Sequence, residues 1–424
     1  MKRRFYVARR EHTQHNQIDK RKHASASAGR KEKPTEAGRR NDHARAERSA
    51  APKRGGQTPA WKRGGNRASG DGRRAGEQLQ TERTPVAFMA SGVAARDWAL
   101  PVAVTVETEA QLAEVLKHDA VALVYLDEAC FTDFAALIRR VHAAGKQAGL
   151  RLRRIERDFD ASGRKAENSA ELLNGLWKAA CNAQTTGVPE RSAEERAAQS
   201  VSSADRGSAA AVEAGSQMSA SGKQLSSCLP DVLLVRNLDE AMLLEDFFGA
   251  HPELVARIRR NFDYTVYGYN QEAIQALVSL GADGLTYPIE LTYHECRKLR
   301  EKLQSIGLGE LPFELMIYGH LPMMVSANCI QRTSARCDHG NRILQLRDRM
   351  GKDMPVRCYC TYCYNQIFNA EPLVLYDLPD EVRALQPQCL RYDFSVEPAA
   401  VVRQVLEGAV PRSMTRGHFR HGIE

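Results

Sequence analysis

From residue 99 onward, short apolar runs alternate with helix-like segments, and this rhythm limits the folds open to the chain. Repeated strand–helix units force a parallel sheet that is covered by helices. Eight such units predict a (β/α)₈ barrel over residues 99–410, although alternation alone leaves an open doubly wound sheet as the alternative. The predicted strands are 101–107, 122–127, 150–155, 231–236, 259–266, 283–289, 313–319 and 388–396.

The segments between these runs carry helix-boundary signals. Thr108 with Gln111, and Thr292 with Glu295, have the spacing of a capping box, in which two side chains satisfy free backbone N–H groups at a helix start. Gly145 is placed to end the helix that follows the second strand.

Three segments depart from the rhythm. Residues 1–86 contain 23 Lys or Arg against 9 Asp or Glu, a net charge of +14, whereas the whole chain is only +8. Because that segment has few aliphatic residues, it predicts a disordered basic tail, which could bind RNA through charge alone. Residues 157–229 are rich in Ser, Ala and Glu and predict a low-complexity insert. Residues 411–424 predict a second, short basic tail.

The compartment decides how cysteines are interpreted. The N-terminus is basic but lacks the apolar run of a secretory signal, and no stretch approaches the length of a membrane-spanning helix. We therefore expect a cytoplasmic protein with no membrane partner. In a reducing compartment, clustered thiols are more often metal ligands or redox groups than disulfides.

Five of the ten cysteines lie in the segment 319–370, directly after the seventh strand. On a barrel, this position is the catalytic face. Thiolates are soft ligands that suit an iron–sulfur cluster or zinc, and a Cys-x-x-Cys pair lets two sulfurs reach one centre. Free thiols remain a further alternative. The predicted ligands are Cys329, Cys337, Cys360 and Cys363, and Cys358 is left without a role.

Other candidate residues lie at strand ends or beside the cysteines. His320 and Asp393, like Asp263 and Glu290, lie at or just past strand ends, and we take His320 and Asp393 as candidate catalytic residues. Three tyrosines among the cysteines could stack on bases or shield a cluster from water; they are Tyr359, Tyr362 and Tyr364. Three arginines could bind a phosphate or an anionic oxygen donor, the alternative being a solvated basic loop; they are Arg332, Arg336 and Arg342.

The stretch "FELMIYGHLPMMVSANC", followed by "RTSARC" and "VRCYCTYCYNQIFN", resembles the diagnostic block of the peptidase U32 family. Glu314, Gly319, Cys329 and Cys337 stand where the family signature has them, which makes Glu314 a third candidate catalytic residue. Where many members have a further cysteine, this chain has Pro322. The resemblance is to the C-terminal half of longer members, which raises the possibility of a separate partner subunit.

The resemblance implies an iron–sulfur protein, with a 4Fe-4S cluster, that hydroxylates a nucleobase in ribosomal or transfer RNA without oxygen. The family name implies a collagenase-like protease instead. Against a zinc protease, Arg297 and Lys298 occupy the place of the second histidine in the His-Glu motif of "YHECR". A non-catalytic partner subunit with a structural zinc site is the third hypothesis.

Overall fold

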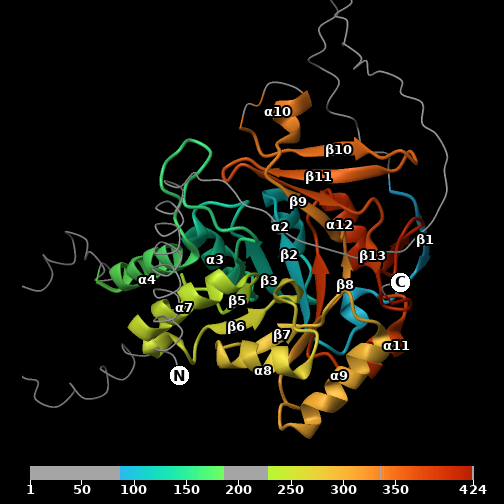
Figure 1. Cartoon of the computed structure of the whole chain (residues 1–424), viewed down its shortest axis with the longest axis horizontal. Helices are drawn as coiled ribbons and strands as arrows, with labels where there is room; N and C mark the ends of the chain where they lie inside the picture. Colours follow the sequence, from blue (N-terminus) through green and yellow to red (C-terminus); the bar gives the residue numbers. More distant parts are fainter. Residues whose placement is uncertain (1–85, 186–227, 335–336, 338, 423–424) are drawn as a thin grey trace, which may run out of the picture. The chain divides into compact units, whose positions relative to one another are not determined.

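The computed structural model describes residues 86–185, 228–334, 337 and 339–422, so the predicted tail 1–86 lies almost wholly outside the described residues. Eight parallel strands form a closed barrel, because the strand order runs in sequence from the first to the eighth and the eighth pairs with the first. The prediction of a (β/α)₈ barrel is therefore confirmed (Figure 1). The barrel strands are β2 (Val102–Val106), β3 (Val121–Asp127), β4 (Gln147–Arg151), β5 (Val232–Val235), β6 (Arg259–Phe262), β7 (Gly284–Thr286), β8 (Phe313–Gly319) and β14 (Cys389–Asp393).

Helices follow these strands in the chain, and the predicted boundary signals act as expected. Both capping boxes form, at Thr108 and at Thr292, and each such cap stabilises its helix by about 1 kcal/mol. Gly145 follows the second helix with a φ of 73°, the left-handed conformation that glycine adopts most readily. The helices between and after the strands are α2 (Glu109–Val115), α3 (Phe134–Ala143), α4 (Ser169–Thr185), α7 (Leu238–Ala250), α8 (Gln271–Ser279), α9 (Tyr293–Ser305), α11 (Pro379–Ala384) and α12 (Ala399–Leu406).

The third strand, predicted at 150–155, is Gln147–Arg151, and the strand predicted at 259–266 ends at Phe262. Two larger differences concern the expected insert and the expected C-terminal tail. Residues 169–185 of the expected insert form α4, the helix between β4 and β5, which buries Leu173 and Leu176 in the core. The helix was not predicted because its residues are mostly small or polar. Its apolar residues are few, but their spacing is that of one face of a helix. The remainder of that insert, from 186 to 227, lies outside the described residues.

The expected basic C-terminal tail is also wrong as a free segment. Strand β15 (Ala409–Pro411) pairs antiparallel with β1 (Phe88–Ser91), and the chain beyond it packs on the barrel. Phe419 is buried against Tyr293, and Arg416 forms an ion pair with Asp377. Phe419 and Arg416 therefore attach to the barrel the segment 411–424, which was predicted to be a tail from its charge.

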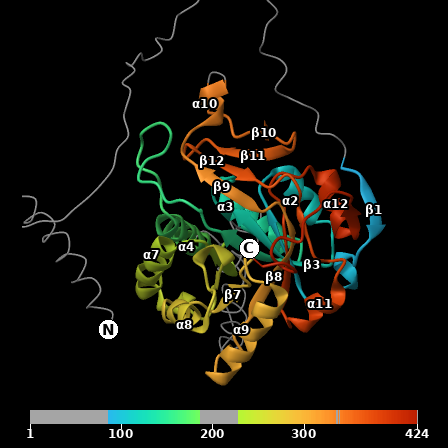
Figure 2. The ribbon, with the colours of Figure 1, turned by 45° about the vertical axis from the view of Figure 1, so that its right-hand side comes forward.

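The cysteine segment folds as a second, antiparallel sheet between β8 and β14. Its spatial order is β10, β11, β12, β9, and the short helix α10 (Ile330–Ser334) projects from it. Figures 1 and 2 both show this sheet against one end of the barrel. Because β9 directly follows the end of β8, that end is the one where the parallel strands terminate. The strands are β9 (Pro322–Ser326), β10 (Ile343–Arg347), β11 (Asp353–Tyr359) and β12 (Tyr364–Phe368).

Candidate functional site

Strand β11 separates two groups of side chains, because successive residues of a strand point to opposite faces. On one face, Arg357 Nη2 donates to the Glu107 carbonyl oxygen at 2.9 Å and Tyr359 Oη donates to Glu107 Oε1 at 3.1 Å. On the other face, Cys358 and Cys360 pack in a small cluster with Leu344 and Val356. A single strand thus joins the end of the barrel to the thiols.

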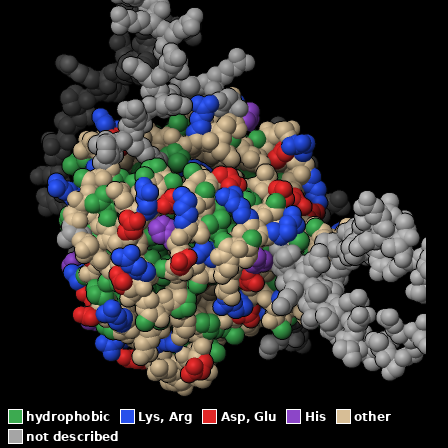
Figure 3. Space-filling model, turned by 180° about the vertical axis from the view of Figure 1, so that it is seen from behind, with side chains coloured by type: hydrophobic (Ala, Val, Ile, Leu, Met, Phe, Trp, Pro, Cys, Tyr) green, Lys and Arg blue, Asp and Glu red, His purple; other side chains and the backbone are tan. Residues whose placement is uncertain are grey.

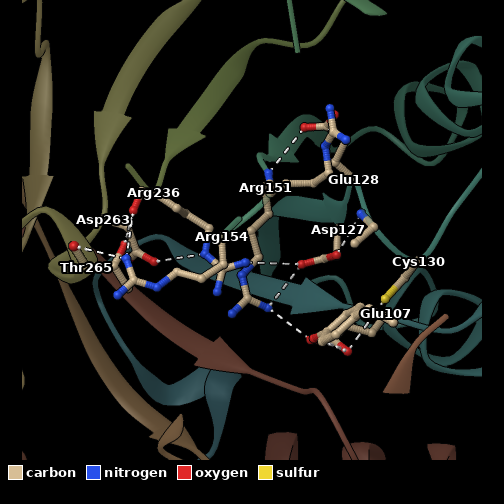
Figure 4. Close-up of polar contacts among 12 residues, drawn as sticks. Glu107, Asp127, Glu128, Cys130, Arg151, Arg154, Arg236, Asp263 and Thr265 are labelled. Atoms are coloured by element: carbon tan, nitrogen blue, oxygen red, sulfur yellow. Dashed lines mark hydrogen bonds and ion pairs between the residues drawn. The ribbon is translucent and has the colours of Figure 1, made fainter. Parts of the chain in front are cut away.

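The barrel end under β11 contains buried charges of both signs, which we call the mouth network. Every member except Arg357, which comes from β11, lies in or directly after a barrel strand; Figure 4 shows Glu107, Asp127, Arg151, Arg236 and Asp263 of this network. Arg151 Nη1 lies 3.2 Å from Glu107 Oε1 and 3.5 Å from Asp127 Oδ2, and Arg236 Nη1 lies 3.6 Å from the same Asp127 oxygen. Buried charges are retained only when they are paired in this way. The members are Glu107, Asp127, Arg151, Arg236, Asp263, Arg357, Arg391 and Asp393.

Glu107 differs from its neighbours because its proton is exchangeable near neutral pH. The pKa of Glu107 is raised from 4.5 to about 7. Burial is the largest cause, the charges of Arg357, Arg151 and Arg236 lower the pKa, and the charge of Asp127 raises it. Glu107 also accepts a long hydrogen bond from the Cys130 thiol, with 3.6 Å between Sγ and Oε2. Burial together with the Glu107 carboxylate raises the pKa of that thiol, so Cys130 is not an activated nucleophile.

Asp393, one of the three predicted catalytic residues, belongs to the mouth network. It ends β14 and lies 3.6 Å from Arg151 and 3.9 Å from Arg391. Burial acts to raise its pKa, but these two arginines outweigh burial and the pKa is lowered. Asp393 is therefore an ionised partner of the arginines and not a proton donor at neutral pH.

His320 and Glu314 lie elsewhere. His320 Nδ1 is 2.7 Å from the Asn369 carbonyl oxygen, and its Nε2 is 3.8 Å from Glu397, so a pairing partner holds each ring nitrogen. Glu314 lies at the start of β8, at the opposite end of the barrel from the cysteines. It accepts from Tyr125 Oη at 2.6 Å and lines a pocket of about 150 Å³ with Cys389. Glu314 also pairs with Arg391 at 3.1 Å, so Arg391 links it to Asp393, whereas His320 lies apart from both.

The five clustered thiols lie close enough to influence one another's ionisation. Burial, together with the neighbouring thiols of Cys358, Cys337, Cys329 and Cys363, raises the pKa of Cys360 to about 12. Burial also raises the pKa of Cys358 to about 11, again with help from Cys329 and Cys337. The thiol without a predicted role, Cys358, thus belongs to the same group, which we call the thiol cluster.

The thiol cluster fits a soft metal in donor chemistry, but it is not closed around a metal-sized space. Cys360 Sγ lies 3.1 Å from the Gly340 carbonyl oxygen, and Cys337 Sγ lies 3.5 Å from Gln331 Oε1. Across the described part of the chain, no three Cys, His, Asp or Glu side chains are placed to hold a metal ion. Metal binding would therefore have to draw these thiols together.

The predicted arginines and tyrosines separate into different environments. Arg332 is exposed on α10, Arg342 lowers the pKa of Cys358 by its charge, and Arg336 lies outside the described residues. Tyr359 and Tyr364 stack on each other at 4.8 Å and are only 2% and 3% exposed. These two rings close the barrel end and cannot stack on a base.

The sequence analysis missed most of the mouth network, although a signal was present. Several of the predicted apolar strands contain, near their end, or are followed by a charged residue, as in "VTVE", "VYLD", "GLRLR", "LLVR" and "LRYD". Acidic and basic endings on strands that meet at one end of a barrel predict a buried charged layer there.

Comparisons with known proteins add little. No family model and no curated sequence matches the chain. Solved structures that match include a protein described as a fructose-1,6-biphosphate aldolase from Coccidioides immitis, at 12% identity and a TM-score of 0.29 over 52% of this chain and 66% of that one. The spore cortex-lytic enzyme SleL of Bacillus cereus matches at 8% identity and a TM-score of 0.30 over 75% and 76%. At such scores these similarities carry no argument about activity.

Proposed function

We propose that this protein is an iron–sulfur protein that hydroxylates a nucleobase of ribosomal or transfer RNA without molecular oxygen. The observation that carries the proposal is that β11 and the residue after it place the thiols of Cys358 and Cys360 on one face, and Arg357 and Tyr359, both bonded to Glu107, on the other. An electron-transferring centre and a proton-exchanging acid, Glu107, would then lie on either side of one strand. The resemblance to the U32 family supports the same activity.

The thiol cluster would supply the ligands, and thiolates are the usual ligands of iron–sulfur clusters. The predicted ligands are Cys329, Cys337, Cys360 and Cys363, and Cys358 is the alternative to Cys363 as the fourth. Cys363 is exposed at the turn between β11 and β12, whereas Cys358 is buried beside Cys360. When bound, such a cluster supplies one-electron transfer, while the chain's own residues position the substrate and hold protons.

The remaining parts of the proposal concern partners and compartment. The basic segment 1–86 would add phosphate binding without sequence preference. A reduced thiol cluster suits the cytoplasm, and no helix within the described ranges is both long and apolar enough to cross a membrane. On the rear face (Figure 3), Lys and Arg side chains are interspersed with Asp and Glu, so this face carries charges of both signs.

A structural zinc site in a non-catalytic partner subunit is the second candidate. It is favoured because Cys360 and Cys363 flank a tight turn of a small antiparallel sheet, as zinc ligands often do. A collagenase-like zinc protease is disfavoured because Glu295 accepts the Thr292 N–H at 2.8 Å, as a helix cap. That carboxylate is committed to the backbone.

Metal analysis of protein purified without oxygen tests the proposal. Iron with sulfide is expected, and Cys329→Ser, Cys337→Ser and Cys360→Ser should each abolish it. Cys296→Ser on α9 and Cys389→Ser at the start of β14 are matched controls, since both thiols pack in hydrophobic clusters other than that of Cys358 and Cys360 and should leave iron unchanged. Comparing Cys358→Ser with Cys363→Ser assigns the fourth ligand.

The activity is tested separately in the host. Deleting the gene should remove a mass increment of one oxygen from a defined RNA base, and restoring the gene should return it. Zinc without iron would favour the structural alternative. Gelatin cleavage by the pure protein that is lost in Cys329→Ala but survives metal removal would restore a collagenase-like protease, with a thiol and not zinc as its catalytic group.

A further inference from the structure

Two exposed tyrosines lie on the same rim of the barrel as the thiol cluster. Tyr267 and Tyr269 follow β6, in the loop that leads to α8, so they lie at the end where the barrel strands terminate. Their side chains are 51% and 36% exposed, although large rings are usually buried. The two rings contact each other, with centroids 5.7 Å apart and planes inclined by 43°. They form one continuous aromatic surface open to solvent.

The backbone of Tyr267 is in a conformation that is unfavourable for a non-glycine residue. Tyr267 has a φ of 60° and a ψ of 48°, the left-handed conformation in which glycine or asparagine is normally found. Its N–H donates to the Tyr264 carbonyl oxygen at 3.1 Å, and the Tyr269 N–H donates to the Tyr267 carbonyl oxygen at 2.9 Å. Strained non-glycine residues that persist in this way concentrate at functional sites.

Arg154 fixes the pair and adds positive charge. Its Nη1 donates to the carbonyl oxygens of Arg236 and Thr265, at 3.0 and 3.1 Å, and its Nη2 donates to Tyr267 Oη at 3.2 Å. Figure 4 shows Arg154 beside Asp263 and Thr265, next to the mouth network. The guanidinium carbon is 6.0 Å from the centre of the Tyr267 ring, so charge and aromatic surface are adjacent.

The rim is continuous from these tyrosines to the thiol cluster. The loop after β4, which carries Arg154, donates from Ala161 N to the Thr361 carbonyl oxygen at 2.8 Å. In the same loop, Arg157 Nη2 lies 3.4 Å from the Cys363 carbonyl oxygen. The loop rises beside the antiparallel sheet in Figures 1 and 2. A ligand held at the tyrosines would therefore lie along one loop from the proposed cluster.

We propose that Tyr267 and Tyr269, with Arg154 beside them, form a stacking surface for unpaired bases of single-stranded RNA. Aromatic rings next to guanidinium groups bind single strands because every base offers a flat face and every nucleotide a phosphate. This inference rests on the proposed function and deepens it by naming where the RNA would be held. It also replaces the buried Tyr359 and Tyr364 as base-binding residues.

The test measures binding of a fluorescein-labelled oligo-uridylate of about 12 nucleotides to the full chain by fluorescence anisotropy. The double variant Tyr267→Ala, Tyr269→Ala should bind at least about tenfold more weakly, whereas Tyr267→Phe, Tyr269→Phe should stay within about threefold. The slope of affinity against salt should not change, because no charge is removed. The exposed Val255→Ala, before β6 at the other end of the barrel, is the control.

Each contrary result overturns the inference. Unchanged affinity in the alanine variant would mean that the two rings do not bind RNA. A peptide would then be the ligand to test for this surface. Equal losses in the phenylalanine and alanine variants would mean that the hydroxyl groups act, not stacking. Iron and sulfide are measured on the same samples. If the protein lacks iron but its RNA binding is lost in the alanine variant, only the proposed function is overturned. If the protein contains iron and sulfide but RNA binding does not depend on the two rings, only this inference is overturned.

Discussion

Replacing Glu107 by Gln tests whether the mouth network contains a carboxyl group that keeps its proton at neutral pH. Glu107 is fully buried and faces Arg151, Arg357 and the Tyr359 hydroxyl. Gln has nearly the same shape but no titratable proton. Any difference between wild type and Glu107→Gln that changes with pH therefore reports the ionisation of this one side chain.

The structure gives the sign and size of that difference. The pKa of Glu107 is raised from 4.5 to about 7 in the folded protein, chiefly by burial. Between these two pH values the unfolded chain loses the Glu107 proton while the folded chain keeps it, so the free energy of unfolding falls as pH rises. At about 1.36 kcal/mol for each pKa unit, the loss is roughly 3 kcal/mol, complete above pH 7.

Glu107→Gln does not undergo this loss. Near pH 4.5 it should be slightly less stable than wild type, since its amide cannot accept from both Arg151 and Arg357 as a carboxyl group does. By pH 8 it should have gained roughly 3 kcal/mol relative to wild type. Urea unfolding at pH 5, 6, 7 and 8, on samples of equal metal content, measures the difference. The exposed Glu109→Gln, which removes one surface ion pair with Arg140, is the control.

Parallel stability curves for wild type and Glu107→Gln would refute the reasoning. They would mean that Glu107 is ionised throughout and that the mouth network holds no exchangeable proton. The proposed role of Glu107 beside the thiol cluster would then lose its basis.

Three further predictions concern the core and the N-terminal segment. Arg391→Met leaves the buried carboxylates of Asp263 and Glu314 without their cation and should lower the free energy of unfolding by about 3–5 kcal/mol. Urea unfolding should show this loss, with partial recovery of stability at acid pH, and equal stability of variant and wild type would contradict the ion-pair assignment. Gly319→Ala places a Cβ 2.9 Å from Asp393 Cβ, at a φ of 153°, and should lower the free energy of unfolding by about 2 kcal/mol. Gly249→Ala, whose Cβ would meet open space on α7, should be neutral or stabilising, and similar melting temperatures for the two variants would refute the close contact at Gly319. Deleting residues 1–86 should weaken RNA binding and flatten its salt dependence while iron content stays unchanged, and equal affinity with and without the segment would show that it does not bind RNA.

Local sequence determined the barrel and its helix boundaries. All eight predicted strands occur, because an apolar run followed by an amphipathic segment can bury both only by packing helix on sheet. Capping at Thr108 and Thr292, and the stop at Gly145, depend on neighbours within a few residues and are therefore readable from the chain. The crowding of cysteines after the seventh strand likewise predicted where the thiol cluster lies.

Only the tertiary structure decided which of the candidate residues meet. Glu314 and His320 are six residues apart, yet one lies at the start of β8 and the other past its end, so they face opposite ends of the barrel. Glu107 and Arg357 are far apart in the chain and lie in contact, because β11 crosses the barrel end. Strand alternation then turns Tyr359 toward Glu107 and Cys358 toward the other thiols. Local propensity fixes each element, but which side chains meet depends on strand pairing between distant segments, and no local pattern encodes that pairing.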